Sequence, residues 1–342
     1  MKIAIIPFAL LFFLGLSHGQ DSIDPTFSII FYNVENLFDT EDDPLTMDEE
    51  FTPESEKKWN KEKYQKKLED LSKVLISVYP DELPEIIGLA EVENCKVLED
   101  LKSTAYLKKG NYEIVHSDGP DERGIDVALL YRKDAIKQVT YEHLPVSFPF
   151  DSIDVTRDIL YVKGSAEDGK DFHFFVNHWS SRSGGMVESE PKRMQCAVTL
   201  RKKIDYVLCH ESDPRIVIMG DFNDEPTNKS IMNILLATNK RKNIGTGDLF
   251  NLFYDRHNSG NVGSYNYKGT WNMLDQIIVS YNLINTKGLY SCNYQDGIIF
   301  SEDWMMYQNE DGQKVPSRTY GGPNYYGGIS DHLPVSIRFR IK

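Results

Sequence analysis

An apolar run and the polar residues after it, at positions 216–224, have side chains suited to binding a ligand. Residues 216–219 are apolar, as in a strand buried on both faces, and Gly220, Asp221, Phe222 and Asn223 follow at once. Asp221 and Asn223 lie two positions apart, so an extended backbone would point their carboxylate and amide the same way. The same pattern also opens ordinary turns. It therefore indicates a functional site only if other strand ends repeat it.

Polar side chains at other predicted strands repeat this pattern. The strands are predicted at residues 27–32, 85–90, 125–131, 171–176, 273–279 and 333–341. The polar side chains that follow them, precede them or lie inside them are Asn33, Glu91, Asp126, His178, Asp275, Asp331 and His332. Each alone has a structural explanation, such as a carboxylate at a helix start or a core histidine. Their joint occurrence favours one functional cluster at a sheet edge.

Amphipathic helices and buried strands are predicted to hold these side chains in place. Apolar residues recur at helical spacing over residues 59–79, and a long helix is predicted over 190–209. Strands at 112–116 and 125–131 are predicted to pair antiparallel. Residues 40–53 and 248–268 are predicted to be loops, and 228–236 a short helix. We find no fixed-period repeat and no linker rich in Pro, Gly and Ser, which predicts one α/β domain over residues 20–342.

The first nineteen residues have the composition of a secretory signal peptide. One early Lys is followed by an apolar run too short to span a membrane comfortably, and Ser17 and Gly19 are small residues before the predicted cleavage point. No second hydrophobic run follows, which disfavours the alternative of a membrane anchor. We therefore expect an exported protein, periplasmic or secreted, with no stable membrane span.

The 342 residues are 40% hydrophobic and 26% charged, enough for a substantial core, and carry a formal net charge of −14. This acidity weighs against tight, sequence-indifferent coating of nucleic acid, which depends on many Lys and Arg contacts to phosphate. It does not exclude phosphate chemistry at a metal, because clustered carboxylates are what a hard divalent cation requires.

The four cysteines are Cys95, Cys196, Cys209 and Cys292. Two of them, Cys196 and Cys209, are predicted to share one helix, where a rise of 1.5 Å per residue separates them by about 20 Å, too far for a disulfide. The sequence has no Cys-x-x-Cys motif, which disfavours a zinc site built from cysteines. A disulfide in the exported protein is compatible with this pattern, but its pairing cannot be assigned.

The sequence resembles the endonuclease/exonuclease/phosphatase superfamily in six motifs, which occur in the order found in that superfamily. They are Tyr-Asn-Val-x-Asn at residues 32–36, Glu91, Asn-His-Trp at 177–179, Gly-Asp-Phe-Asn at 220–223, Asp275, and Ser-Asp-His at 330–332. The superfamily includes pancreatic-type deoxyribonuclease, abasic-site endonucleases, inositol polyphosphate phosphatases and bacterial sphingomyelinases. The resemblance implies a four-layer α/β sandwich, in which two mixed β-sheets pack face to face with helices outside.

The resemblance also implies a phosphoesterase that uses Mg²⁺ or Mn²⁺, and the chemistry of the residues agrees with it. Glu91 is the best primary metal ligand, with Asn33 and Asp331 completing the shell, because Mg²⁺ prefers oxygen. His332 is the predicted general base and Asp275 its orienting partner. The remaining predicted roles are phosphate binding by His178 and Asn223, orientation of His178 by Asp126, and orientation of water or assistance to the leaving group by Asp221.

Two motifs of known subfamilies are absent from the sequence, which narrows the range of expected substrates. The sequence lacks the Tyr-x-Pro-Asn motif of abasic-site endonucleases and the Pro-x-Trp-x-Asp-Arg motif of inositol phosphatases. A monomeric nuclease is favoured. The alternative is a phosphatase or phosphodiesterase acting on a small or lipid-linked phosphate, and a non-catalytic binding module is disfavoured because no acid/base residue is missing.

Surface residues should distinguish these hypotheses. A nuclease should have a basic strip beside the site, and a small-phosphate enzyme a closed pocket. The predicted strip consists of Arg157, Arg182, Lys192 and Arg193. The Gly-rich segment 317–328, which is predicted to form neither helix nor strand, carries Tyr320, Tyr325 and Tyr326. These tyrosines are predicted to select what the phosphate is attached to, while the alternative is a solvated loop.

Overall fold

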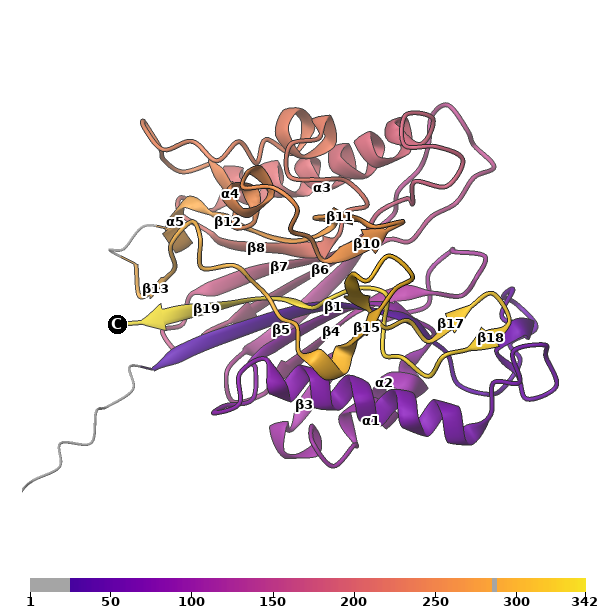
Figure 1. The fold of residues 1–342 in the computed structure, drawn as a ribbon. Coiled ribbons are helices and arrows are strands. Elements are labelled where there is room, and N and C mark those ends of the chain that lie inside the picture. The colour runs from indigo at the N-terminus through magenta and orange to yellow at the C-terminus, as the bar shows by residue number, and fades with distance from the viewer. Residues whose placement is uncertain (1–24, 285–287) are drawn as a thin grey trace, which may run out of the picture.

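The computed structural model describes residues 25–284 and 288–342. The predicted signal peptide, residues 1–19, lies outside these ranges. Two β-sheets pack face to face, with α1 and α2 covering one outer face and α3 covering the other (Figure 1). This is the predicted four-layer α/β sandwich.

The first sheet contains seven strands in the order β13-β19-β1-β2-β4-β3, with β14 also paired to β19. Only the β1–β2 pair is parallel. The strands are β1 (Thr26–Leu37), β2 (Ile86–Val92), β3 (Tyr112–Val115), β4 (Asp126–Arg132), β13 (Tyr290–Ser291), β14 (Ile298–Ile299) and β19 (Val335–Ile341).

The second sheet contains six strands in the order β5-β6-β7-β8-β12-β9, and its only parallel pair is β7–β8. The strands are β5 (Lys137–Leu144), β6 (Ile159–Ser165), β7 (Asp171–His178), β8 (Arg215–Asp221), β9 (Leu249–Asn251) and β12 (Asp275–Ser280). Three short hairpins lie outside the sheets. They are β10 (Tyr265–Tyr267) with β11 (Thr270–Asn272), β15 (Met306–Gln308) with β16 (Lys314–Pro316), and β17 (Tyr320–Gly321) with β18 (Asn324–Tyr325).

Three of the helices have eight or more residues: α1 (Lys61–Ser77), α2 (Cys95–Lys102) and α3 (Glu190–His210). The shorter ones are α4 (Tyr254–Asn258), α5 (Tyr281–Ile284), the 3-10 turns η1 (Glu49–Phe51), η2 (Lys108–Gly110) and η4 (Asp303–Met305), and the π-helical turn η3 (Ser230–Ile234). None of the helices in the described ranges is long and apolar enough to cross a membrane.

Side-chain alternation along the central strands explains the layers. In β1, Ile29 and Phe31 enter the core between the two sheets, while Ile30 and Tyr32 pack in the core that includes Leu71 of α1. Successive residues of a strand point to opposite faces, so a strand with apolar residues at every position must be covered on both sides. The continuous apolar runs noted in the sequence therefore belong to central strands.

The structure confirms the main strands and helices and corrects three smaller expectations. The segment 40–53 contains η1, whose Phe51 is buried and stacks on Phe38 at 4.3 Å between ring centroids. The segment 248–268 contains β9, which completes the second sheet. The Gly-rich segment forms the hairpin of β17 and β18, because Gly322 adopts a left-handed φ of 60° between the two strands.

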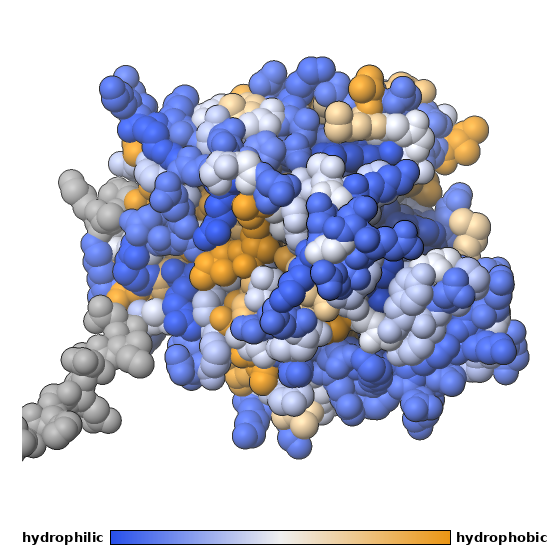
Figure 2. Space-filling model, in the orientation of Figure 1, coloured by the Kyte–Doolittle hydropathy of each residue, from blue (hydrophilic) through white to orange (hydrophobic). Residues whose placement is uncertain are grey.

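The surface in the same orientation is mostly hydrophilic, with an apolar area near its middle (Figure 2). All four cysteines are free, and Cys196 and Cys209 both lie on α3 as predicted. The fold therefore owes its stability to its three apolar cores, one between the sheets and one beneath each helical layer.

Candidate active site

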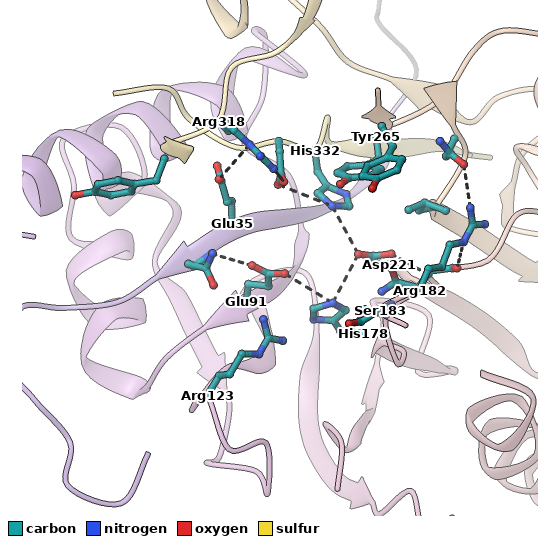
Figure 3. A pocket seen from close by; sticks show the side chains of 18 of the residues that line it. Glu35, Glu91, Arg123, His178, Arg182, Ser183, Asp221, Tyr265, Arg318 and His332 are labelled. Atoms are coloured by element: carbon teal, nitrogen blue, oxygen red, sulfur yellow. Dashed lines mark hydrogen bonds and ion pairs between the residues drawn. The ribbon is translucent and has the colours of Figure 1, made fainter. Parts of the chain in front are cut away.

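A cavity of about 1350 Å³ lies at the edge where polar strand ends of both sheets meet. The predicted residues that line it are Glu91, His178, Asp221, Asn223, Asp331 and His332. Figure 3 shows Glu91, His178, Asp221 and His332 pointing toward one another. Asn33 and Asp275 do not line the cavity, but each contacts residues that do. The structure thus brings together every predicted site residue except Asp126.

Strand register places the residues that the second sheet contributes. His178 at the end of β7 pairs with Asp221 at the end of β8, and Asp275 at the start of β12 pairs with Asp221 from the other side. All three are buried. Neighbouring strands lie about 4.8 Å apart, so register alone holds these three side chains in a row.

Asp275 and His332 form a tight buried pair. Asp275 Oδ2 lies 2.7 Å from His332 Nδ1 and also accepts a 2.5 Å hydrogen bond from Ser264 Oγ. The Tyr265 ring stacks on the His332 ring with centroids 4.7 Å apart. These contacts fix the ring, and its Nε2 faces the Asp221 and Asp331 carboxylates at 3.8 Å and 4.0 Å.

The charge of His332 differs from what a resting general base requires. Burial disfavours the charged ring, but Asp275 and Asp221 outweigh it and raise the pKa of His332 well above its ordinary value. A protonated ring donates a hydrogen bond to a phosphate oxygen, whereas a general base must start neutral. The general-base role of His332 stays a prediction, and this electrostatic environment favours a donor.

Asp221 is the centre of the cluster. Its Oδ2 accepts a 3.1 Å hydrogen bond from Asn33 Nδ2 and lies 3.7 Å from His178 Nε2. Burial raises the pKa of Asp221 to about 6, and the Asp275 carboxylate adds to the shift. A carboxylate that titrates near neutral pH is suited to exchanging a proton with water or with a leaving group.

The first sheet presents its residues through irregular backbone. The β1–β2 register shifts after Asn33, and Glu91 adopts a left-handed φ of 64°. Glu91 Oε2 accepts a 3.0 Å hydrogen bond from the Asn36 backbone N–H, and Asn33 Nδ2 lies 3.4 Å from Glu91 Oε1. The Asn33 amide therefore directs its nitrogen at the carboxylates, while its Oδ1 accepts the Glu35 N–H at 3.1 Å. Its role as a metal ligand stays a prediction.

His178 is fully buried, and burial lowers its pKa well below the ordinary value. Its Nε2 lies 3.8 Å from Glu91 Oε1, and its buried Nδ1 has no hydrogen-bond partner among the described residues. The predicted orienting contact from Asp126 is therefore not made. Asp126 instead accepts a 3.0 Å hydrogen bond from the Gly119 N–H, because the loop before β4 folds back over it.

Asn223 keeps part of its predicted capacity to donate. Its Nδ2 donates one hydrogen bond to the Trp179 carbonyl at 3.0 Å, and an amide NH₂ carries two donors. Its second N–H has no acceptor within the described part of the chain and is available to a ligand. Its backbone N–H also donates to Asp221 Oδ1 at 2.9 Å, which joins the two predicted residues as one turn.

Several cavity residues were not predicted from the sequence. Arg318 donates to Asp331 Oδ2 at 2.5 Å and lies 3.9 Å from Glu35 Oε1. Burial raises the pKa of Glu35 to about 7, with a further contribution from Asp331. Beneath them the buried Lys67 ammonium donates to the carbonyls of Glu35 and Ile329. The signal for Arg318 was its place in the Gly-rich segment, whereas nothing local marks Lys67.

The predicted basic strip forms only in part. Arg157 and Arg182 line the cavity, together with the unpredicted Arg123, Arg318 and Lys57. Arg193 is fully buried and pairs with Asp224 at 2.6 Å, and Lys192 pairs with Asp154. These two positions on α3 support the helix rather than a ligand. The basic side chains therefore lie around the cavity, among its carboxylates, instead of along a strip.

The tyrosines of the Gly-rich segment are placed differently from the prediction. Only Tyr320 lines the cavity, and its hydroxyl donates to the Lys57 carbonyl at 3.0 Å. Tyr325 and Tyr326 are not among the lining residues, whereas Tyr265 and Tyr267 of β10 are. Aromatic surface for a ligand comes from the β10–β11 hairpin more than from the segment singled out in the sequence.

The donor atoms of the cavity fit a divalent cation. Asp221, Asp275 and His332 offer ligand atoms within 4.8 Å of one another, and the buried Asp275 Oδ1 has no hydrogen-bond partner in residues 25–284 and 288–342. The predicted ligand Glu91 shares the donor Asn33 with Asp221, so it belongs to the same group of carboxylates. Buried carboxylates with open lone pairs are what an oxygen-preferring cation stabilises.

Comparisons with known proteins identify the family and the fold of this chain. Residues 28–341 match the model of the Endonuclease/Exonuclease/phosphatase family. No curated protein matches the sequence significantly.

Similar folds occur in solved structures that share little sequence with this chain. A family protein from Bacteroides thetaiotaomicron has a TM-score of 0.56 and 16% identity, covering 93% of this chain and 99% of that one. The B. thetaiotaomicron mannosyl-6-phosphatase has a TM-score of 0.56 and 17% identity, and the match covers 92% of this chain and 99% of that one. D. rerio TDP2 complexed with single-strand DNA product has a TM-score of 0.56 and 14% identity, and the match covers 92% of this chain and 99% of that one. With a family match over nearly its whole length, this chain belongs to the endonuclease/exonuclease/phosphatase family of phosphoesterases.

Proposed function

We propose that the protein is a divalent-metal-dependent nuclease that hydrolyses phosphodiester bonds in single-stranded nucleic acid or at nucleic-acid ends. The observation that carries this proposal is the size and lining of the cavity. Its volume of about 1350 Å³ exceeds the roughly 300–1,000 Å³ typical of small-molecule pockets. Arg123, Arg157, Arg182 and Arg318 line it together with Tyr265 and Tyr267. Arginines suit a phosphate backbone, and aromatic rings suit bases.

The net charge of −14 is compatible with this substrate because four arginines line the cavity beside its carboxylates. A nuclease that holds a few nucleotides needs local phosphate contacts rather than a basic surface. The D. rerio TDP2 structure, which has the same fold, contains a single-strand DNA product. That similarity supports a nucleic-acid substrate for this chain.

In this proposal, Glu91 and Asp331, with Asn33 beside Glu91, are the residues that would hold Mg²⁺ or Mn²⁺. The bound cation would neutralise charge on the phosphate oxygens and lower the pKa of water. The protein side chains do the rest. His178 and the free Asn223 N–H bind non-bridging oxygens, and Asp221 orients the attacking water or protonates the leaving oxygen.

The pair of His332 and Asp275 supplies the second acid/base group. Asp275 holds His332 Nδ1, so Nε2 is presented to the cavity in a fixed orientation. Depending on its charge, Nε2 either accepts a proton from water or donates to a phosphate oxygen. Tyr265 covers the ring and keeps bulk water from that face.

A second candidate function is hydrolysis of a small or lipid-linked phosphate. One observation favours it: Lys192 and Arg193 are each paired with a carboxylate, so these two positions of α3 add no basic strip beside the cavity. The similar fold of the B. thetaiotaomicron mannosyl-6-phosphatase supports the same alternative. The arginines around the cavity would then bind one phosphate and the group attached to it.

A substrate panel separates the two candidates. The protein is incubated with Mg²⁺ or Mn²⁺ and, in parallel, with end-labelled single-stranded DNA and RNA, plasmid DNA, sphingomyelin, and sugar phosphates. The nuclease proposal predicts that an oligonucleotide is turned over with the highest kcat/KM. Turnover of sugar phosphate or sphingomyelin with oligonucleotides left intact would replace it with the second candidate.

We also propose that residues 1–19 direct export and that residues 20–342 act as a monomeric single domain. The signal-like composition of residues 1–19 supports export. Mass spectrometry of the protein recovered outside the cytoplasm should find Gln20 as the first residue. Light scattering after gel filtration should give the mass of one chain, and a dimer mass would overturn the monomer.

A further inference from the structure

A second group of metal-binding side chains lies apart from the residues that line the cavity. His116 follows β3, Asp118 lies in the turn after it, and Asp126 begins β4, the antiparallel neighbour of β3. Each offers one ligand atom, and these atoms lie within 4.8 Å of one another. None of the three residues lines the cavity. The group therefore needs its own explanation.

The His116 ring points an unpaired nitrogen at this group. Its side chain is 1% exposed, and its buried Nε2 has no hydrogen-bond partner among the described residues. Nε2 lies 3.9 Å from Asp126 Oδ2, which is too far for a hydrogen bond. An imidazole nitrogen without a hydrogen-bond partner is available as a metal ligand.

Negative charge in the group is not balanced by protein cations. Within the described residues, no Lys or Arg forms an ion pair with Asp118 or Asp126, and the nearby Arg157 is paired with Asp121 at 2.7 Å. Among the residues that the structure describes, only the Gly119 N–H donates a hydrogen bond to the Asp126 carboxylate. A buried carboxylate with so few partners is costly unless a cation joins it.

We propose that His116, Asp118 and Asp126 bind a second divalent cation of the borderline class, for which Zn²⁺ is the probe. One imidazole nitrogen and two carboxylate oxygens make a ligand set typical of Zn²⁺, which binds such atoms at about 2.0–2.2 Å. Tetrahedral bonds of that length put ligands about 3.3–3.6 Å apart, so donor atoms that lie up to 4.8 Å apart must close by up to about 1.5 Å. Asp118 is exposed and lies in a turn, so it can make that movement. A fourth position remains for water.

This site differs in chemistry from the cavity. The cavity adds Glu91 and Asp331 to Asp221, and Asp275 holds the His332 ring, so carboxylates dominate there and suit Mg²⁺ or Mn²⁺. In the second group the His116 Nε2 has no partner among the described residues, and Mg²⁺ does not favour such a nitrogen ligand. It also gives Asp126 a role, because the carboxylate predicted to orient His178 makes no contact with that ring. The inference rests on contacts around His116 alone and does not depend on the proposed nuclease activity.

The test is a count of bound zinc. Metal-free full-length protein is dialysed against Zn²⁺ in the presence of excess Mg²⁺, and bound zinc is measured by mass spectrometry for wild type, His116→Ala and His210→Ala. His210 is an exposed histidine at the end of α3 and serves as the matched control. We expect His116→Ala to bind one zinc fewer than wild type and His210→Ala to match wild type. Equal zinc content in all three proteins would overturn the proposal.

Two further variants keep the test decisive if His116→Ala folds poorly. Asp118 is exposed, so Asp118→Asn should fold normally while weakening zinc binding by at least about tenfold, measured by calorimetry. Asp221→Asn alters only the cavity and should leave this zinc in place. An unchanged zinc affinity in Asp118→Asn, or loss of the same zinc in Asp221→Asn, would assign the ion to another site.

Discussion

The two walls of the cavity are built in different ways. The wall from the second sheet places His178, Asp221 and Asp275 side by side on three adjacent strands in regular register. The wall from the first sheet presents Glu91 and Asn33 where the β1–β2 register shifts. Left-handed backbone at Glu35, Asn36 and Glu91 accompanies that shift.

This difference indicates how each wall is stabilised. Regular strands hold their side chains at no cost in backbone strain, whereas each left-handed non-glycine residue costs about 1–3 kcal/mol and persists only if its surroundings fix it. Here the Asn36 N–H bonded to Glu91 and the buried Lys67 supply that support. Conservative substitutions should therefore lower the free energy of unfolding less in the regular wall than in the irregular one. Substitutions in either wall should lower activity.

The largest expected effect on activity comes from the buried pair of His332 and Asp275. His332→Ala should lower kcat by roughly three to five decades, since the acid/base or donor group is lost. Asp275→Asn should cost less, because the ring remains but loses its charged partner. Steady-state rates on the best substrate of the panel provide the measurement. Wild-type rates in both variants would show that this wall is not catalytic.

Glu91→Gln tests the irregular wall. It removes one carboxylate charge from the cation site, so we expect the Mg²⁺ concentration for half-maximal activity to rise by roughly one to two decades. Glu99→Gln, on the exposed face of α2, is the matched control and should behave as wild type. The assay is a Mg²⁺ titration of activity, and superimposable curves for the two variants would remove Glu91 from the cation site.

Lys67→Met tests how the irregular wall is supported. Lys67 Nζ donates to the Glu35 and Ile329 carbonyls and to Thr319 Oγ1, so its loss leaves buried acceptors unpaired at about 1–3 kcal/mol each. We expect a fall in Tm of several degrees and a higher KM as the segment that carries Arg318 loosens. Lys61→Met, an exposed position on the same helix, should change neither value. Equal melting curves for both variants would mean that Lys67 does not support this wall.

The smallest expected effect on activity comes from Tyr267, an exposed residue at the edge of the cavity. Tyr267 lines the cavity and is 55% exposed, so Tyr267→Ala should raise KM for an oligonucleotide about five- to tenfold through loss of one stacking contact, with kcat nearly unchanged. Tyr326→Ala, at an exposed tyrosine that does not line the cavity, is the control. If the two variants have the same KM, Tyr267 does not contact the substrate.

The sequence predicted the regular wall better than the irregular one. His178 and Asp221 end apolar runs, and Asp275 is embedded in another, so strand pairing was enough to bring them together. The positions of Asn33 and Glu91 were also marked by strand ends, but the register shift that orients them depends on contacts distant in sequence.

Other features could not be predicted for the same physical reason. Lys67 has the spacing of an ordinary helical residue, and its burial results from the packing of residues 317–329 on α1. Arg193 was predicted to lie in an exposed basic strip, but the fold places Asp224 beside it and the two form a buried ion pair. Asp126 was correctly recognised as a buried charge, but its partners are set by the backbone of the loop before β4, which has no simple sequence signal.

Metal dependence of nucleic-acid hydrolysis is the most direct test of the account. End-labelled single-stranded DNA is incubated with the wild-type protein in Mg²⁺, in excess chelator, and after Mg²⁺ is restored, with His332→Ala assayed alongside. We predict cleavage in Mg²⁺, none in chelator, recovery when Mg²⁺ returns, and none detectable for His332→Ala over the same period. Undiminished cleavage in excess chelator, or equal cleavage by His332→Ala, would contradict a metal-dependent site built from these two walls.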